Sequence, residues 1–264
     1  MILLYVAVAA LYAVAAWARW PRSGDVPTRS SWIVAVLPIA LALHAVLLVR
    51  AIFAPEGVDL SFTHALSLVA GLAALIAWAS GLLRLLPRVS GVILPMAAVA
   101  VLLPLLATSP HRFPYADAPW ATVHIAVALI AYALFVVAAL QAVMLTGVER
   151  QVRGGLATTG GPTPPLLTLE RYLFRLIGAG FALLTLALAS GFIFSEQLFG
   201  KPVTFTHKNV FSVAGWLVFA TLLFGRARYG WRGRTALKWI LAGTLMLVLG
   251  YLGSKFVTEV LLHR

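Results

Sequence analysis

The stretch Trp120–Thr146 reads WATVHIAVALIAYALFVVAALQAVMLT and contains no charged side chain. It exceeds the roughly 20 apolar residues that a helix needs to cross a bilayer. Seven further apolar stretches follow the same pattern, and all are continuous runs, which excludes the short alternating strands of a membrane β-barrel. The predicted spans are 1–18, 32–53, 63–83, 91–108, 120–146, 172–194, 210–224 and 236–257.

The composition extends this prediction to the whole chain. Of its 264 residues, 62% are hydrophobic and 11% are charged, whereas about a quarter of the residues in a soluble domain are charged. A protein of this size has too little interior to bury so much apolar surface, which excludes a soluble enzyme, a disordered chain and a fibrous protein. We therefore expect an all-α polytopic membrane protein with about eight transmembrane helices, in which residues 1–264 form a single domain.

The net charge of +12 is distributed unevenly among the predicted loops. Lys and Arg concentrate in alternate loops, of which the last contains Arg226–Lys238. Because loops rich in Lys and Arg stay on the cytoplasmic side, we expect both termini outside, which in a bacterium is the periplasmic face of the inner membrane. The charge thus indicates orientation, and we expect no nucleic-acid partner.

The histidines also follow this topology. His44 lies inside the second predicted span, and His124 lies about one turn inside the fifth. The other four lie on the predicted outer side: His64, His111, His207 and His263. Polar groups at membrane depth are costly and often mark functional sites, and neutral imidazole is a common ligand of metals and haem iron. The alternative is that His44 and His124 only form hydrogen bonds between helices.

Several other chemistries lack the residues that they require. The absence of cysteine excludes a thiolate metal site, a C-x-x-C redox pair and haem attachment through C-x-x-C-H. The chain has no H-E-x-x-H or G-x-S-x-G motif, and no predicted span contains an acidic residue. Arg50 and Lys208, near predicted outer ends, are natural partners for haem propionates. The alternative for Arg50 is that it snorkels to the membrane surface.

Three segments carry a family resemblance. They are HIAVALIAYAL at His124–Leu134, LHAVLLVR at Leu43–Arg50, and GWRGR at 230–234 followed by LGYLGS at 249–254. In their order and spacing they resemble the cytochrome c assembly proteins of the CcsA type, and in particular the smaller YpjD/HemX-like branch. The resemblance implies haem handling at the outer membrane face, paired histidine ligands and presentation of haem to apocytochrome c.

The chain departs from the family pattern at several positions. Residues 194–209 contain no tryptophan where the relatives carry a tryptophan-rich loop, and His207-Lys208 stands about where that loop has Asp-Pro-Lys. Phe224 replaces a histidine at the inner end of a span, and His263 is one residue out of register with the last one. We therefore do not expect an enzyme that acts alone, while a haem-lyase-like role stays open.

The resulting hypothesis is a haem-binding inner-membrane protein for cytochrome c assembly, haem transport or haem delivery. The resemblance implies non-covalent b-type haem, with His44 and His124 as the axial pair, His207 as an alternative ligand, and Arg50 and Lys208 holding the propionates. The expected partners are the lipid bilayer and apocytochrome c or another cytochrome-assembly membrane protein.

Two other functions remain open at this point. One is a permease subunit or membrane scaffold that docks a partner on the basic loop Arg226–Lys238. The other is an enzyme that acts on a lipid or quinone, although the sequence offers no acid–base pair for it.

Overall fold

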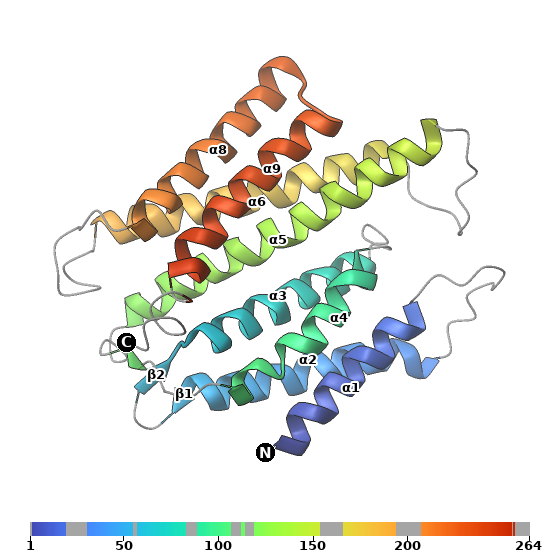
Figure 1. Cartoon of the computed structure of the whole chain (residues 1–264), viewed down its shortest axis with the longest axis vertical. Coiled ribbons are helices and arrows are strands. Elements are labelled where there is room, and N and C mark those ends of the chain that lie inside the picture. Colours follow the sequence, from blue (N-terminus) through green and yellow to red (C-terminus); the bar gives the residue numbers. More distant parts are fainter. Residues whose placement is uncertain are drawn as a thin grey trace.

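The computed structural model describes residues 2–19, 31–54, 57–82, 89–106, 112–113, 119–153, 166–193, 207–254 and 256. Within these ranges the chain forms eight α-helices, and each overlaps one predicted span, so the expected helical architecture is confirmed (Figure 1). The helices are α1 (Ile2–Arg19), α2 (Ser31–Ile52), α3 (Phe62–Leu82), α4 (Ser90–Ala100), α5 (Pro119–Arg153), α6 (Leu166–Ile193), α8 (His207–Tyr229) and α9 (Gly233–Val248).

Six of the described helices are long and apolar enough to cross a membrane, namely α2, α3, α5, α6, α8 and α9 with the turn after it. The helices α1 and α4 are apolar but shorter. The predicted span 91–108 is divided, because α4 ends at Ala100 and the chain continues as a 3₁₀ turn at Leu103–Leu106. Pro104 lies in this turn and has no N–H to donate to the carbonyl one turn earlier, so that α-helical hydrogen bond is missing here.

Two predicted boundaries fall short of the structure because the helix continues beyond its apolar run. The helix α5 extends to Arg153, past the predicted end at residue 146, and α6 begins at Leu166, before residue 172. An apolar run marks the part of a helix that lies in hydrocarbon, whereas the backbone hydrogen bonds continue into the polar region. The long α5 and α6 thereby carry charged residues beyond the apolar core of the bundle.

Three very short strands add a feature that the all-α prediction did not include. They are β1 (Phe53–Ala54), β2 (Gly57–Asp59) and β3 (Arg112–Phe113), in the order β1-β2-β3 with both pairs antiparallel. Phe53 pairs with Val58, which in turn pairs with Phe113. Two or three residues are too few to show an alternating pattern in sequence. The sheet connects the end of α2 to the beginning of α3.

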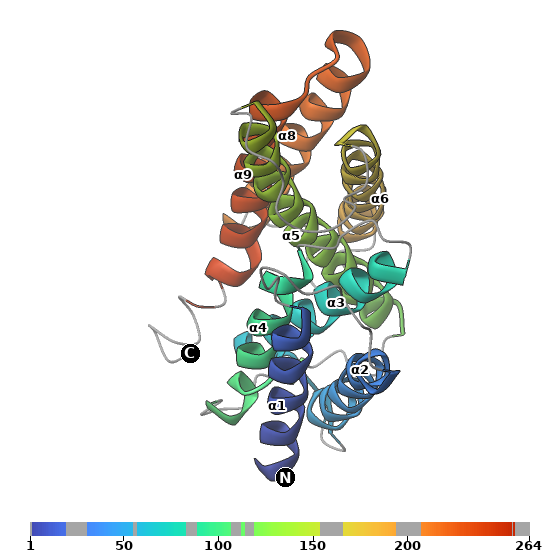
Figure 2. The same cartoon turned by 90° about the vertical axis from the view of Figure 1, so that its right-hand side faces the viewer.

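The helices pack as two groups that meet along α3 and α5. The first four helices lie together on one side of the molecule, and α5, α6, α8 and α9 lie on the other (Figures 1 and 2). The helix α3 contacts α2, α4 and α5, whereas α5 contacts α6 and α9. α3 therefore separates α2 from α5 and is the element through which the two groups are joined.

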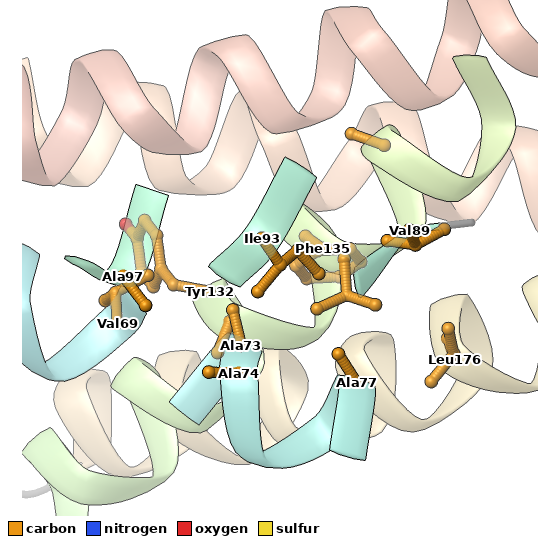
Figure 3. Packing of buried hydrophobic residues seen from close by; sticks show 14 of the residues in the cluster. Val69, Ala73, Ala74, Ala77, Val89, Ile93, Ala97, Tyr132, Phe135 and Leu176 are labelled. Carbon is orange, nitrogen blue, oxygen red and sulfur yellow. The ribbon is translucent and has the colours of Figure 1, made fainter. Parts of the chain in front are cut away.

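The interior combines small residues with a few aromatic rings. Figure 3 shows Ala73 and Ala77 of α3 close to Tyr132 and Phe135 of α5, with side chains of α4 beside them. The ring of Phe135 stacks on that of Phe219 at a centroid distance of 3.9 Å. Small residues allow membrane helices to approach closely, and the resulting van der Waals contacts stabilise a bundle in lipid.

The two ends of the bundle differ in their side chains. The end of α2 and the beginnings of α3, α5 and α8 lie at one end, which we call the histidine end (Figure 1). The end of α5, the beginning of α6 and the turn between α8 and α9 lie at the other, which we call the arginine end. The residues that define them are His64, His124 and His207 for the histidine end, and Arg150, Arg226, Arg232 and Arg234 for the arginine end.

Candidate functional site

His124 lies in the second turn of α5, and its ring is held by α6. Its Nδ1 atom lies 2.8 Å from Oγ of Ser190, and the Ser190 hydroxyl donates to the carbonyl of Ala187 at 3.1 Å. Because this hydroxyl has one proton, its oxygen accepts a hydrogen bond from Nδ1–H of His124. The resulting tautomer carries its lone pair on Nε2, an atom through which neutral histidine binds metals.

His124 has a small residue, Gly191, on one side and a cationic residue, Lys208, in its wider surroundings. A Cβ atom added to Gly191 would lie 3.2 Å from Cε1 of His124 and 3.9 Å from its Nε2. The ammonium group of Lys208, at the beginning of α8, lies within electrostatic range of the ring. His124 of α5 and Lys208 of α8 thus lie at the same end of the bundle and interact through the charge of the ammonium group.

A tyrosine cluster adjoins this pair. Lys208 Nζ lies 5.2 Å from the centroid of the Tyr251 ring, which in turn lies 5.7 Å from the ring of Tyr132. Ser212 of α8 lies close to the hydroxyl of Tyr132. Tyr251 belongs to the π-helical turn Leu249–Gly253 that follows α9. Single π-helical turns occur frequently at functional sites, and this one contributes its ring to the surroundings of Lys208.

His44 lies between other helices than His124 and has other hydrogen-bond partners. Its side chain is 1% exposed, with Nδ1 3.1 Å from the Tyr12 hydroxyl and Nε2 3.0 Å from the Ser67 hydroxyl. A Cβ on Gly71 would approach Cε1 of the ring to 3.1 Å. These neighbours come from α1 and α3, so His44 connects three helices by hydrogen bonds. Hydrogen bonds between helices, the alternative for both histidines, are thus present at His44 and also at His124, which bonds to Ser190 of α6.

The remaining predicted residues are placed as follows. His207 is the first residue of α8 and is exposed. Arg50 is exposed in the last turn of α2 and, among the described residues, forms no ion pair. His111 and His263 lie outside the described residues, as does most of the segment 194–209, of which the structure describes only 207–209.

The sequence alone suggested no site role for His64, which has the most extensive polar surroundings among the described histidines at the histidine end. Its Nδ1 lies 2.6 Å from Oγ of Ser61 and 3.7 Å from Oδ2 of Asp59. Oδ1 of Asp59 also accepts the backbone N–H of Ser61 at 3.1 Å. The signal for this cluster is the pattern Asp-x-Ser-x-x-His directly before an apolar run, since Asp and Ser often precede a helix.

This cluster is not a Ser-His-Asp catalytic triad. A triad requires the serine on Nε2 and the carboxylate on Nδ1, whereas Ser61 and Asp59 both approach Nδ1 of His64. Among the described residues, no group of three or more His, Asp or Glu side chains is arranged to hold a metal ion.

Comparison with known proteins identifies the relatives of this chain. The sequence model of the family described as cytochrome c assembly protein matches residues 32–262. The inner membrane protein YpjD of Escherichia coli is 34% identical over 143 residues, which is 54% of this chain and 54% of YpjD. An uncharacterized 28.8 kDa protein of Azospirillum brasilense is 36% identical over 187 residues, or 69% of each chain.

A third relative comes from the CcsA proteins. The cytochrome c biogenesis protein CcsA of Picosynechococcus sp. is 32% identical over 106 residues, which is 39% of this chain and 31% of that protein. The chain thus aligns with about half the length of YpjD and with a smaller part of this CcsA protein. No solved structure matches it. Because the family match extends over residues 32–262, the protein belongs to the cytochrome c assembly protein family.

Proposed function

We propose that this protein handles haem in the membrane during cytochrome c assembly, and that it holds or presents haem at the histidine end through His124. The observation that carries the proposal is the hydrogen bond from His124 Nδ1 to Ser190, because it selects the tautomer with the lone pair on Nε2. Family membership supports haem as the cofactor, and relatives named for cytochrome c biogenesis support the same process.

Each residue near His124 has a distinct role in this proposal. Ser190 orients the imidazole, and Gly191 allows the ring to pack closely against α6. Lys208 is the proposed partner of a propionate, and its exposed neighbour His207 is the proposed exchangeable ligand. When bound non-covalently, haem supplies an iron that accepts axial nitrogen ligands. Arg50 is the predicted partner of a second propionate.

The axial pairing of His124 with His44 stays a prediction. For His44 to bind iron through Nε2, the ring must give up its hydrogen bond to Ser67 and leave the contact with Gly71. Moreover, α3 lies between α2 and α5, and it contributes both of these contacts. Within the described residues, the geometry favours a ligand role for His124 and a role in helix association for His44.

The absorbance spectrum of the purified protein, expressed with haem supplied, tests the function. We expect a Soret band that is lost in His124→Ala and retained in His44→Ala, and no change in Thr221→Ala, which alters a hydroxyl bonded only to its own helix. A wild-type protein without a Soret band would contradict haem binding. A band lost in His44→Ala but retained in His124→Ala would reverse the assignment of the ligand.

We further propose that α1 and α4 also cross the membrane, giving eight spans with both termini and the histidine end outside. The basic residues at the arginine end support this orientation in a bacterial inner membrane, where YpjD is named as residing. Because the chain has no cysteine, single replacements report cleanly on sidedness. In intact spheroplasts, a membrane-impermeant maleimide should label Ile193→Cys and not Arg228→Cys, and the opposite labelling would refute the orientation.

The scaffold or permease alternative depends on a basic loop that is available to a partner. Two of the arginines in Arg226–Lys238 form ion pairs with Glu170, namely Arg226 at 2.6 Å and Arg232 at 3.2 Å. These two arginines are therefore engaged in ion pairs within the protein, which makes them less available to a partner. Family membership supports haem handling over this alternative, and we retain apocytochrome c or another assembly protein as the expected partner.

A further inference from the structure

A cavity of about 380 Å³ lies at the arginine end, far from His124 along α5. Its volume falls in the range of roughly 300–1,000 Å³ that is typical of small-molecule sites. Residues from α5, α6 and the beginning of α9 form its walls. The charged lining residues are Glu149, Arg150, Glu170, Arg232 and Arg234.

One wall of the cavity is held rigidly by the turn between α8 and α9. Gly230 has a φ of 68°, a conformation that favours glycine, and its N–H donates to the carbonyl of Arg226. The indole of Trp231 packs so closely on Gly225 that a Cβ there would collide with it, and Trp231 also stacks on Trp239 at 5.4 Å. The turn thus presents the following residue, Arg232, in a defined place.

The ion pairs beside the cavity offset only part of its charge. Glu170 is buried in α6, and Oε1 of its carboxylate forms ion pairs with both Arg226 and Arg232. Arg150 and Arg234 are exposed and, among the described residues, form no ion pair. Glu149 lies against the beginning of α9, with Oε2 3.3 Å from the position of a Cβ on Gly233.

The balance of these groups favours an anion over a cation. Three guanidinium groups and two carboxylates line the cavity, which leaves a net charge of +1, and Arg226 pairs with Glu170 beside it. The first turn of α9 adds its positive dipole end, and the residue before it provides no side-chain cap. Guanidinium groups pair with phosphate through two parallel hydrogen bonds, so converging arginines are typical of phosphate recognition.

We propose that this cavity binds a phosphate group, supplied either by the headgroup of an anionic phospholipid or by a soluble phosphate compound, with Arg150, Arg232 and Arg234 as its partners. Basic pockets between membrane helices on the cytoplasmic side are known to accept anionic headgroups. The location at the arginine end suits that leaflet. The proposal is independent of haem, because the cavity residues of α5 lie at the opposite end of that helix from His124.

The test uses the full chain in nanodiscs and compares two double variants. The cavity variant is Arg150→Gln with Arg234→Gln, and the control is Arg228→Gln with Lys238→Gln, which removes the same charge from residues outside the cavity. Native mass spectrometry measures retained phosphatidylglycerol in discs that also contain phosphatidylcholine. A separate titration measures binding of inorganic phosphate in discs of phosphatidylcholine alone.

We expect the cavity variant to lose about fivefold in affinity for each guanidinium removed, while the control retains wild-type affinity. Loss of phosphatidylglycerol retention alone identifies a lipid headgroup, and loss of phosphate binding alone identifies a soluble ligand. Equal behaviour of the two double variants in both measurements would overturn the proposal. If the cavity variant fails to fold by circular dichroism, Thr235→Glu, which adds a carboxylate to the lining, provides the same comparison.

Discussion

Replacing Ser190 with alanine separates the orientation of His124 from its presence. The Ser190 oxygen accepts the Nδ1 proton at 2.8 Å, while the Ser190 hydroxyl donates to Ala187 of the same helix. Alanine removes the acceptor and leaves a polar Nδ1–H without this partner at membrane depth. The imidazole then loses the contact that fixes its tautomer and its ring orientation, although the ligand atom itself remains.

The size of the effect follows from the behaviour of other metal-bound histidines. Loss of the hydrogen-bond partner behind a ligating histidine typically weakens metal affinity by about 10–100-fold, which corresponds to about 1.4–2.7 kcal/mol. We expect Ser190→Ala to raise the dissociation constant for haem by such a factor. The assay is a titration of the purified protein with haem, followed at the Soret maximum.

Two further variants make this titration decisive. Ser190→Thr retains a hydroxyl at the same place and should restore most of the affinity, whereas Thr221→Ala should have no effect, because Thr221 bonds only to the Leu217 carbonyl. A Ser190→Ala protein with wild-type haem affinity, in a series where His124→Ala abolishes binding, would refute the tautomer argument. Equal losses in Ser190→Ala and Thr221→Ala would show only general destabilisation.

Further predictions concern the packing of the bundle. Gly71→Val should lower the free energy of unfolding by about 1–3 kcal/mol, because its side chain overlaps the His44 ring. Gly81→Val in the same helix should not, since a Cβ there would meet no atom within 4 Å other than those of the neighbouring backbone. Thermal unfolding in detergent measures both variants, and equal stability would contradict the contact. Glu170→Gln should destabilise the protein by about 2 kcal/mol, below the value for fully buried pairs because the Arg232 side chain is 59% exposed. An unchanged midpoint of unfolding would show that its ion pairs contribute little.

The fold could be predicted largely from where apolar residues run continuously. Those runs located all eight described helices, because a membrane helix must be apolar over its length in hydrocarbon. The apolar runs predicted the ends of helices poorly where the helix continues through polar residues, as at Arg153 of α5. They did not indicate the pairing of Phe53 with Val58, since such short strands depend on contacts made in the folded chain.

The candidate site was less predictable because it depends on which helix faces which. Sequence alone placed His44 and His124 at membrane depth, but only the structure shows that Tyr12 and Ser67 surround the first and Ser190 the second. No local pattern relates residues on different helices in this way. The same holds for Glu170, which lies just before the predicted sixth span and whose two arginine partners come from the α8–α9 hairpin.

The most direct test of the central claim is imidazole rescue of His124→Gly, measured by the absorbance spectrum of the haem-supplied protein. Removing the side chain leaves a space beside Ser190 and Gly191 that free imidazole can enter. We predict that His124→Gly loses the wild-type Soret band and regains it when imidazole is added. A His124→Gly protein that retains the wild-type spectrum without imidazole would contradict haem binding through His124.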